Sequence, residues 1–252
     1  MKRTVLVTGA TGLIGTQLVK RFLRDGCRVV GTSRRLEALS AFGAALPAGS
    51  DFVGVVADLG GDGNGSEGLV RELATRGLLP HAVVNNAFDM ANQKLDPGGH
   101  PRRDQWMTEF DYAVVVPYRI ATGIAEASDS PLDAVVNIAS MYGIVPRNPA
   151  LYDNPTLESP IHYGVAKAAM IHLTRELAVR LAPKKIRVNA VSYGGVEGRA
   201  GETFKARYAK LVPMGRMLRP EETAGIVAML ASADASAITG QNVVVDAGFT
   251  VW

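Results

Sequence analysis

Short, almost continuously apolar runs alternate with longer amphipathic stretches along the whole chain. Such runs are typical of strands that are buried on both faces of a parallel sheet. Their alternation with helical stretches indicates one α/β domain, residues 1–252, with a doubly wound parallel sheet between two layers of helices. The expected strands are Thr4–Thr8, Arg28–Ser33, Phe52–Val56, Ala82–Asn86, Ala134–Ala139, Ile186–Val191 and Asn242–Val245. The expected helices are Gly12–Arg24, Ser66–Arg76, Trp106–Glu126, Tyr163–Leu181 and Pro220–Ala231.

Two long stretches interrupt this alternation. Residues 88–104 and 144–160 are rich in proline, glycine and asparagine, and each follows an expected strand. Ligands of doubly wound sheets bind beyond the carboxyl ends of the strands, and long irregular loops are usually functional. We therefore expect substrate loops near 88–104 and 144–160, and a third near 194–212. The glycine-rich stretch 60–68 is expected to be a flexible surface loop.

Composition excludes several classes of protein. The single cysteine, Cys27, permits no disulfide within the chain, and a small buried thiol is its simplest interpretation. The net charge is only +3, and the cluster Lys184, Lys185 and Arg187 is typical of a solvated helix end, so no nucleic-acid partner is expected. Neither a signal sequence, an apolar run long enough for a membrane span, nor metal-ligand spacing is apparent. We therefore expect a cytoplasmic protein without a metal.

A glycine-rich turn follows the first expected strand. Gly9 would permit the tight turn, Gly12 would let a pyrophosphate approach the backbone, and Gly15 would let the next helix pack closely. Phosphates would then lie against the N-terminus of that helix, where N–H groups and the helix dipole favour an anion. The sequence predicts a dinucleotide-binding turn; an ordinary turn is the alternative.

The end of the second expected strand bears on the choice of dinucleotide. An acidic residue usually stands there when the ribose is unphosphorylated, but this chain has Arg34 and Arg35. Arginine pairs with a phosphate through two hydrogen bonds. NADP(H) is therefore favoured over NAD(H). The alternative is that both arginines merely begin a surface helix.

Together these motifs resemble those of the single-domain short-chain dehydrogenases/reductases. The resemblance extends over essentially the whole chain and is carried by Thr8–Gly15, Asp58, Asn85–Ala87, Asn137–Ser140, Tyr163–Lys167, Arg187–Val191, Thr239–Asn242 and Asp246–Gly248. It implies a Rossmann fold and hydride transfer between a nicotinamide and a small carbonyl or alcohol substrate. It also implies cofactor contacts from Thr11, Leu13 and Ile14 in the turn, from Asp58 and Leu59 at the adenine, from Asn86 and Ala87 along the ribose and pyrophosphate, and from Val196 at the carboxamide.

The resemblance implies that Ser140, Tyr163 and Lys167 are catalytic. Tyr163 and Lys167 are four residues apart, so they share one face of a helix. An ammonium beside a phenol, like the charge of an oxidised nicotinamide ring, lowers the phenol's pKa, so that Tyr163 can exchange a proton with the substrate oxygen. Ser140 would hydrogen-bond that oxygen, and Tyr163 and Lys167 would also contact the cofactor. Without the other motifs, a tyrosine and lysine at this spacing would be an ordinary amphipathic pair.

Several positions depart from the family pattern. The family's catalytic asparagine is not evident; Ala113 stands near its place, and Asp111 is the nearest polar candidate. Tyr193 replaces a usual proline, Phe88 a usual glycine, and Gly198 a residue that often carries a hydroxyl. The glycine spacing is commoner in sugar-nucleotide epimerases. These changes predict an atypical pocket.

The segment between Ser140 and Tyr163 is longer than in most of the family. The added residues, roughly Pro146–Pro160, should cover the substrate, and with their context they resemble dehydrogenases of flagellin and sugar modification. That resemblance would imply a sugar-derived substrate. A sugar epimerase or dehydratase with transient nicotinamide redox, and a degenerate NADP-binding regulator, stay as alternatives. The family implies a homotetramer, or alternatively a homodimer. His162 is interpreted as a packing or hydrogen-bonding residue.

Overall fold

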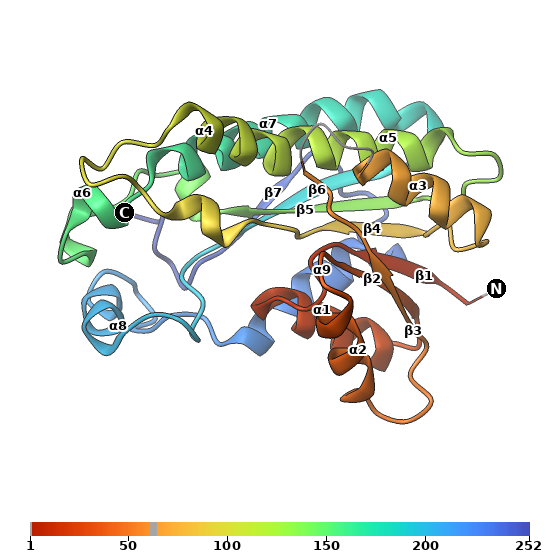
Figure 1. Ribbon diagram of the computed structural model, residues 1–252, viewed down its shortest axis with the longest axis horizontal. Helices are drawn as coiled ribbons and strands as arrows, with labels where there is room; N and C mark the ends of the chain where they lie inside the picture. The colour runs from red at the N-terminus through yellow and green to blue at the C-terminus, as the bar shows by residue number, and fades with distance from the viewer. Residues whose placement is uncertain (1, 61–64) are drawn as a thin grey trace.

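Seven parallel strands form one sheet in the middle of the molecule (Figure 1). The structure is a computed structural model that describes residues 2–60 and 65–252. The strand order is β3-β2-β1-β4-β5-β6-β7, so the chain winds from the centre to one edge, crosses back and winds to the other edge. The strands are β1 (Thr4–Val7), β2 (Arg28–Ser33), β3 (Phe52–Val56), β4 (Ala82–Asn85), β5 (Ala134–Ser140), β6 (Arg187–Tyr193) and β7 (Asn242–Val245). This is the predicted doubly wound sheet, and all seven strands were expected.

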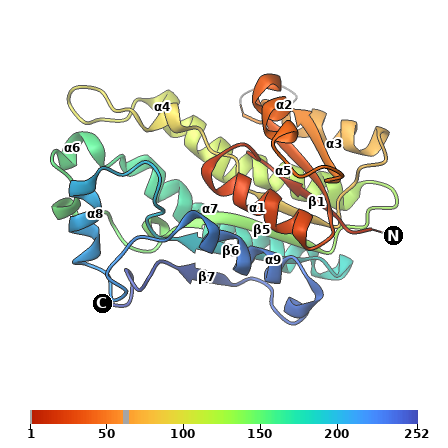
Figure 2. The same ribbon diagram turned by 90° about the horizontal axis from the view of Figure 1, so that it is seen from below.

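Helices cover both faces of the sheet and complete the three layers (Figures 1 and 2). One face carries α1 (Leu13–Arg24), α2 (Leu36–Ala44) and α9 (Ala224–Leu230); the other carries α3 (Gly65–Thr75), α4 (Arg103–Phe110), α5 (Val116–Glu126) and α7 (Ile161–Leu181). Successive strand residues point to opposite faces, so Val5 and Val7 pack under α1 and α9, whereas Leu6 packs under α5 and α7. No helix within the described ranges is long and apolar enough to cross a membrane.

A π-helical turn, Asp111–Val115, divides the helix that was expected to run from Trp106 to Glu126. Proline lacks an N–H group, and its ring clashes with the carbonyl four residues earlier in an α-helix. Pro117 stands in the first turn of α5, so the chain widens just before it. This turn lies against α7, where Ala113 packs in one cluster with Ala166 and Met170.

Part of the expected glycine-rich loop is helical. α3 begins at Gly65, where a Cβ atom would lie 1.9 Å from the carbonyl oxygen of Asp58, so glycine is required by this close approach. The prediction of a loop was therefore wrong for residues 65–68, and residues 61–64 lie outside the described residues. The helix expected at Ser66–Arg76 is confirmed, with bounds one residue earlier at each end, and burial of Ser66, Leu69 and Leu73 stabilises it.

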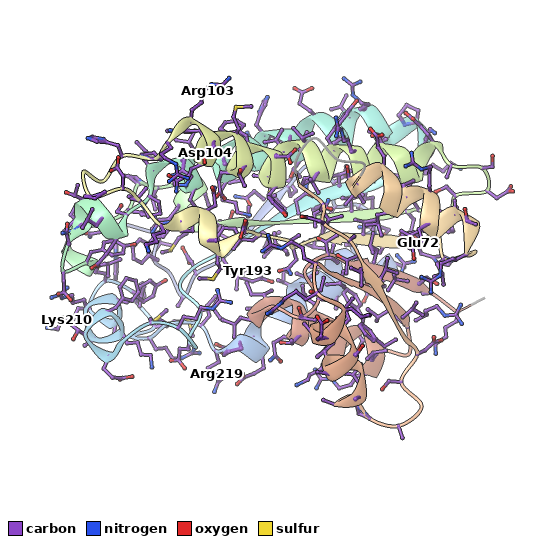
Figure 3. All side chains as sticks on the ribbon, in the orientation of Figure 1. Glu72, Arg103, Asp104, Tyr193, Lys210 and Arg219 are labelled. Carbon is purple, nitrogen blue, oxygen red and sulfur yellow. The ribbon has the colours of Figure 1, made fainter. Side chains whose placement is uncertain are left out.

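A small lobe lies beyond the carboxyl ends of β5 and β6. It contains α6 (Pro155–Glu158) and α8 (Glu202–Ala209), which both contact the 3-10 turn Pro149–Leu151 and lie at the same end of the molecule in Figure 2. An apolar cluster of its own holds it together, comprising Met141, Leu151, Tyr208, Val212, Met217 and Phe249. Figure 3 shows the charged side chains Arg103, Lys210 and Arg219 at the periphery and Tyr193 near the centre. Two of the three expected substrate loops, 144–160 and 194–212, contribute to this lobe.

Candidate active site

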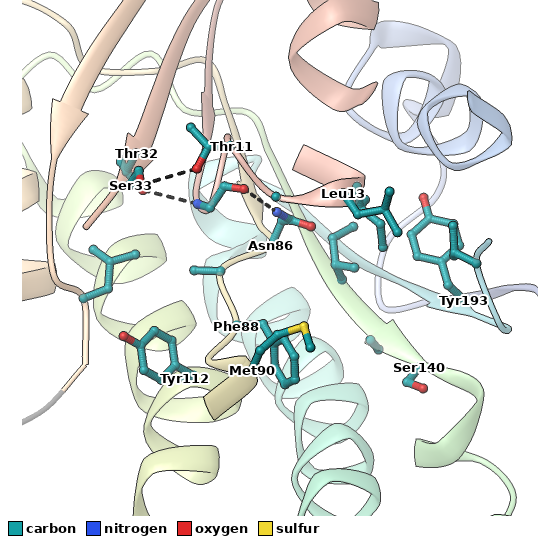
Figure 4. A pocket seen from close by; sticks show the side chains of 18 of the residues that line it. Thr11, Leu13, Thr32, Ser33, Asn86, Phe88, Met90, Tyr112, Ser140 and Tyr193 are labelled. Carbon is teal, nitrogen blue, oxygen red and sulfur yellow. Dashed lines mark hydrogen bonds between the residues drawn. The ribbon is translucent and has the colours of Figure 1, made fainter. Parts of the chain in front are cut away.

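A cavity of about 590 Å³ lies at the carboxyl ends of β1, β2, β4, β5 and β6. In a doubly wound sheet, ligands bind at this edge, where the strand order reverses. All but one of the residues predicted for cofactor binding or catalysis line it: Gly9, Thr11, Gly12, Leu13, Ile14, Arg34, Arg35, Leu59, Asn86, Ala87, Ser140, Tyr163, Lys167 and Val196. The exception, Asp58, accepts a hydrogen bond of 3.2 Å from Tyr112 in the cavity wall. Figure 4 shows Thr11, Ser33 and Asn86 around the turn, and Ser140 at the end of β5.

The glycine turn has the geometry that an anionic ligand needs. Gly9 has a φ of +64°, and a Cβ atom at Gly15 would lie 2.2 Å from the carbonyl oxygen of Gly9. The N-cap of α1 is Gly12, so no side chain caps this helix, and no acidic residue stands in its first turn. The N–H groups of that turn therefore point toward the cavity without a side-chain partner, where they can bind a phosphate.

The two arginines after β2 serve both interpretations made from the sequence. Arg35 is the N-cap of α2, so the pair does begin a helix, and both residues also line the cavity. The Arg34 guanidinium pairs with the Asp89 carboxylate at 3.2 Å, while about half of the Arg34 side chain remains exposed. Such an exposed pair is weak, so Arg34 can exchange Asp89 for a ligand phosphate at low cost.

Ser140, Tyr163 and Lys167 converge on one wall of the cavity. Ser140 ends β5 and is held by a hydrogen bond of 3.2 Å that its Oγ accepts from the Tyr142 amide. Lys167 is 6% exposed; its Nζ donates to the carbonyl of Ile138 at 2.7 Å and lies 5.8 Å from the centre of the Tyr163 ring. The sequence predicted all three, because a strand end and a helical i, i+4 pair place them together.

The electrostatics around Tyr163 differ from the expectation. Burial raises the pKa of the Tyr163 phenol, while the Ser140 hydroxyl and the Arg147 guanidinium act to lower it. Arg147 is a cation near Tyr163 that the sequence did not predict, and the Lys167 ammonium, from which a lower pKa was expected, donates to the Ile138 carbonyl. Burial lowers the pKa of Lys167 itself to about 8, and the Glu109 carboxylate acts in the opposite direction.

Glu109 is a site residue that sequence reasoning missed. Ala113, near the position of the family's asparagine, is a buried apolar residue in the π-helical turn. One turn earlier, Glu109 is 2% exposed and accepts hydrogen bonds from Asn92 at 2.9 Å and Gln93 at 2.7 Å. It is the buried carboxylate whose charge acts on both Tyr163 and Lys167. In the sequence, the only sign of this role was a carboxylate on the apolar face of the helix expected at Trp106–Glu126.

A buried polar network joins the loop 88–104 to α7. The carbonyl of Asn92 lies 3.0 Å from His162 Nε2 and accepts a hydrogen bond from Gln105 at 3.0 Å. His162 is fully buried, and its ring lies 5.9 Å from that of Trp106. It is therefore a packing and hydrogen-bonding residue, as the sequence indicated. The network fixes the residue that directly precedes Tyr163.

Three departures from the family pattern have structural counterparts. The hydroxyl of Tyr193 donates to the carbonyl of Thr223, so the side chain links β6 to the segment before α9. Gly198 has a φ of +129°, and a Cβ atom there would lie 3.2 Å from the Leu13 side chain. Phe88 packs edge-on against Tyr163, with 5.5 Å between ring centres. The pocket is thus built differently from the pattern at these three positions.

Comparison with known proteins places these features in one family. A family model described as enoyl-(acyl carrier protein) reductase matches residues 9–250. Galactitol 2-dehydrogenase of Rhizobium johnstonii is 31% identical over 258 residues, covering 98% of this chain and 95% of that protein. The short-chain type dehydrogenase/reductase y4vI of Sinorhizobium fredii is also 31% identical, but this chain spans only 43% of its length.

Solved structures agree with the sequence relatives. A short-chain dehydrogenase from Leptospira borgpetersenii, solved with bound NAD+, superposes with a TM-score of 0.85 at 25% identity, covering 99% of this chain and 93% of that one. Because the fold, the glycine turn and the Ser140, Tyr163 and Lys167 cluster accompany matches over nearly the whole length, the protein belongs to the short-chain dehydrogenase/reductase family of oxidoreductases.

Proposed function

We propose that this protein is an NADP(H)-dependent oxidoreductase that interconverts a carbonyl and an alcohol on a small, sugar-derived substrate. The observation that carries the proposal is the convergence of Ser140, Tyr163 and Lys167 on the cavity that the glycine turn also lines. A nucleotide-binding turn alone would serve many functions. A phenol and an ammonium buried beside the same cavity are groups that can exchange a proton with a bound substrate.

The residues of the cavity fit a nicotinamide dinucleotide. The uncapped first turn of α1 would hold the pyrophosphate, with Gly9, Gly12 and Gly15 keeping the backbone close. Asp58 and Leu59 would bound the adenine, Asn86 and Ala87 the adjoining ribose, and Val196 the carboxamide. Arg34 and Arg35, at the end of β2, support a 2′-phosphate and thus NADP(H) over NAD(H). When bound, this cofactor supplies or accepts the hydride.

The side chains manage the proton and the orientation of the substrate. In reduction, Tyr163 Oη gives its proton to the carbonyl oxygen; in oxidation it takes the proton from the alcohol. Ser140 Oγ donates a hydrogen bond to the same oxygen and holds it next to Tyr163. Lys167 would hold the ribose beside the nicotinamide. Its pKa is lowered to about 8, so its ammonium is retained below about pH 8.

The proposal also covers the class of substrate and the oligomeric state. The segment 144–160 and α8 form the lobe beyond β5 and β6, next to the reacting residues, where they can cover a substrate. A sugar-derived substrate is supported by the resemblance to sugar-modifying dehydrogenases and by the similarity to galactitol 2-dehydrogenase. We further propose a homotetramer or a homodimer, for which exposed Val165 and Val179 on α7 offer apolar surface.

The Tyr163→Phe variant tests the catalytic role. It removes the exchangeable proton but keeps the ring that packs on Phe88. We expect NADPH oxidation to fall by roughly 100-fold or more, while NADPH affinity changes only a few-fold. Loss of reduced-nicotinamide absorbance, measured over a panel of sugar-derived and simple carbonyls, checks the first expectation, and NADPH fluorescence checks the second. Full activity in the variant would refute the mechanism.

The same panel separates the alternative functions. Stoichiometric oxidation of NADPH by any carbonyl supports the proposed reductase. Product formation without net oxidation would support an epimerase or dehydratase with transient redox. Tight NADPH binding with no reaction on any panel member would support a regulatory nucleotide-binding protein.

A further inference from the structure

Arg147 holds a positive charge against the ring of Tyr163. Its guanidinium carbon lies 5.4 Å from the centre of the Tyr163 ring and 4.4 Å from that of Tyr142, so two aromatic rings flank it. Arg147 belongs to the segment 144–160, which joins the 3-10 turn after β5 to the start of α7. A fixed cation therefore lies beside the residue that exchanges the proton, on the segment that covers the substrate.

Phenols and a backbone carbonyl, not carboxylates, orient this guanidinium. Arg147 Nη1 donates to the Tyr152 hydroxyl at 3.2 Å and to the carbonyl of Glu158 at 3.5 Å, and the hydroxyls of Tyr142 and Tyr152 lie 3.0 Å apart. Burial raises the pKa of Tyr142 well above its usual value, so that phenol stays neutral. Asp153, in the same segment, pairs instead with Arg207 at 2.7 Å. Within the described residues, no acidic side chain forms an ion pair with Arg147.

One edge of the guanidinium is left without a partner. Arg147 Nε is buried and has no hydrogen-bond acceptor among the described residues, and both hydrogen bonds of the group leave from Nη1. A buried donor without an acceptor is costly and calls for an explanation, the more so on a charged group. The Nε and Nη2 groups form the fork that a carboxylate takes through two parallel hydrogen bonds.

We propose that Arg147 binds a carboxylate of the substrate, so that the enzyme acts on keto acids or hydroxy acids, including acidic sugar derivatives. This inference rests on the proposed oxidoreductase function and names the class of substrate within it. The carboxylate pairs with the Nε edge, and the carbonyl to be reduced lies at Tyr163 Oη and Ser140 Oγ. Arg147 thus selects the substrate by charge and orients it for proton transfer.

If the role of Arg147 were purely structural, its side chain would only hold the segment 144–160 in place against α7. The two roles differ in what removal of the charge does. Loss of a purely structural contact should weaken the binding of acidic and neutral ligands alike. Loss of a carboxylate partner should weaken only the binding of acidic ligands. Paired ligands that differ in charge but hardly in shape therefore distinguish them.

Calorimetry of the protein loaded with NADP+ provides the test, with malonate and malonamide as probes. We expect the wild-type protein to bind malonate at least about tenfold more tightly than malonamide, as a charge-assisted pair requires. Arg147→Gln should abolish this preference, and Arg147→Lys should retain part of it, because a lysine keeps the charge but loses the fork. Arg207→Gln, a matched control in the same lobe whose partner is Asp153, should keep the full preference.

The outcomes separate the two proposals. Equal binding of malonate and malonamide to the wild-type protein, no binding of malonate, or an unchanged preference in Arg147→Gln would overturn the assignment of Arg147. The ratio of kcat/KM for acetoacetate and acetoacetamide gives an independent reading that should fall with Arg147→Gln. If Arg147→Gln does not fold, Arg147→Lys carries the same comparison. Failure of the oxidoreductase proposal would show instead as no NADPH oxidation by any carbonyl, acidic or neutral.

Discussion

Two opposing effects set the pKa of Lys167. Burial lowers the pKa of its ammonium to about 8, and the Glu109 carboxylate limits the fall. Because the folded pKa lies below the ordinary value of about 10.4, the folded state binds fewer protons between these two values. The cost of burying the ammonium is therefore fully present below about pH 8 and disappears as the pH rises above the unfolded pKa. Activity that needs the ammonium should fall above about pH 8.

Glu109→Gln tests this balance. The substitution removes the charge but keeps a side chain of the same shape that can still accept from Asn92 and Gln93. The pKa of Lys167 should then fall further, so the alkaline loss of kcat/KM should begin at a lower pH than in the wild-type protein. Glu72→Gln, which removes an exposed carboxylate that pairs with Arg76, serves as the control. A profile in Glu109→Gln that coincides with that of the wild type would contradict this role.

At the residue scale, local spacing decided what the sequence could predict. Tyr163 and Lys167 share one face of a helix, and Ser140 ends a strand, so their meeting follows from secondary structure alone. Glu109 and Arg147 act on Tyr163 through tertiary contacts, one from α4 and one from a long connection. Their burial and their partners depend on how separate elements pack, which a periodic pattern does not contain.

At the scale of elements, the close packing of α1 on the glycine turn is the constraint most open to test. A Cβ atom at Gly15 would lie 2.2 Å from the Gly9 carbonyl oxygen and 3.0 Å from Ala10. Because the opposing atoms belong to the backbone, α1 would have to move away. The N–H groups of its first turn would move with it, so stability and nucleotide affinity depend on the same contact.

Gly15→Ala should therefore destabilise the fold by about 1–3 kcal/mol and weaken NADP+ binding. Gly68→Ala is the matched control, because Gly68 lies in α3 and a Cβ atom there would meet no other atom within 4 Å. That substitution should stabilise the helix by about 0.5–1 kcal/mol, since alanine favours a helix more than glycine does. Urea unfolding followed by circular dichroism measures both changes. A loss of stability in the control equal to that in Gly15→Ala would refute the packing argument.

The elements that could be predicted are those with a strong apolar pattern. Each of the seven strands contains at least two valines, and the long helix α7 has a regular series of buried positions. α8 was missed because half of its residues are polar and Tyr208 is its one buried residue. α2 was missed because only Leu39 is buried within it. The π-helical turn before Pro117 lies in a continuous helical pattern, where only the geometry of proline indicates a break.

At the scale of the whole molecule, arginines gather at the carboxyl edge of the sheet. Arg34, Arg35 and Arg199 line the cavity, and the Arg147 guanidinium lies 5.4 Å from the ring centre of Tyr163, which also lines it. These guanidinium groups place positive charge where the ligands are proposed to bind, in a chain whose net charge is only +3. A positive cleft attracts anions and increases their rate of association, an effect that salt weakens. Both proposed ligands, a phosphorylated dinucleotide and a carboxylate substrate, are anions.

Nucleotide binding and protein stability are linked, so thermal unfolding can measure the nucleotide preference. A ligand that binds only the folded protein stabilises it by about 2.7 kcal/mol at 100 times its Kd. For a chain of this length, each kcal/mol raises the Tm by about 2–4 °C. Thermal unfolding in NADP+ and in NAD+, at equal concentrations, therefore reports which nucleotide the folded cavity prefers.

Arg34→Ala should remove most of the preference for NADP+. If Arg34 binds the 2′-phosphate, its loss should weaken NADP+ by about tenfold or more, which lowers the Tm in NADP+ by about 3–5 °C and leaves the Tm in NAD+ nearly unchanged. Asp89→Asn should act in the opposite direction, because it frees Arg34 from its ion pair while an asparagine can still accept the Ala91 amide. The wild-type preference should also shrink with added salt, since the Arg34 side chain is half exposed. Equal Tm shifts by NADP+ and NAD+ in the wild-type protein would show instead that the arginines begin α2 and do not select the cofactor.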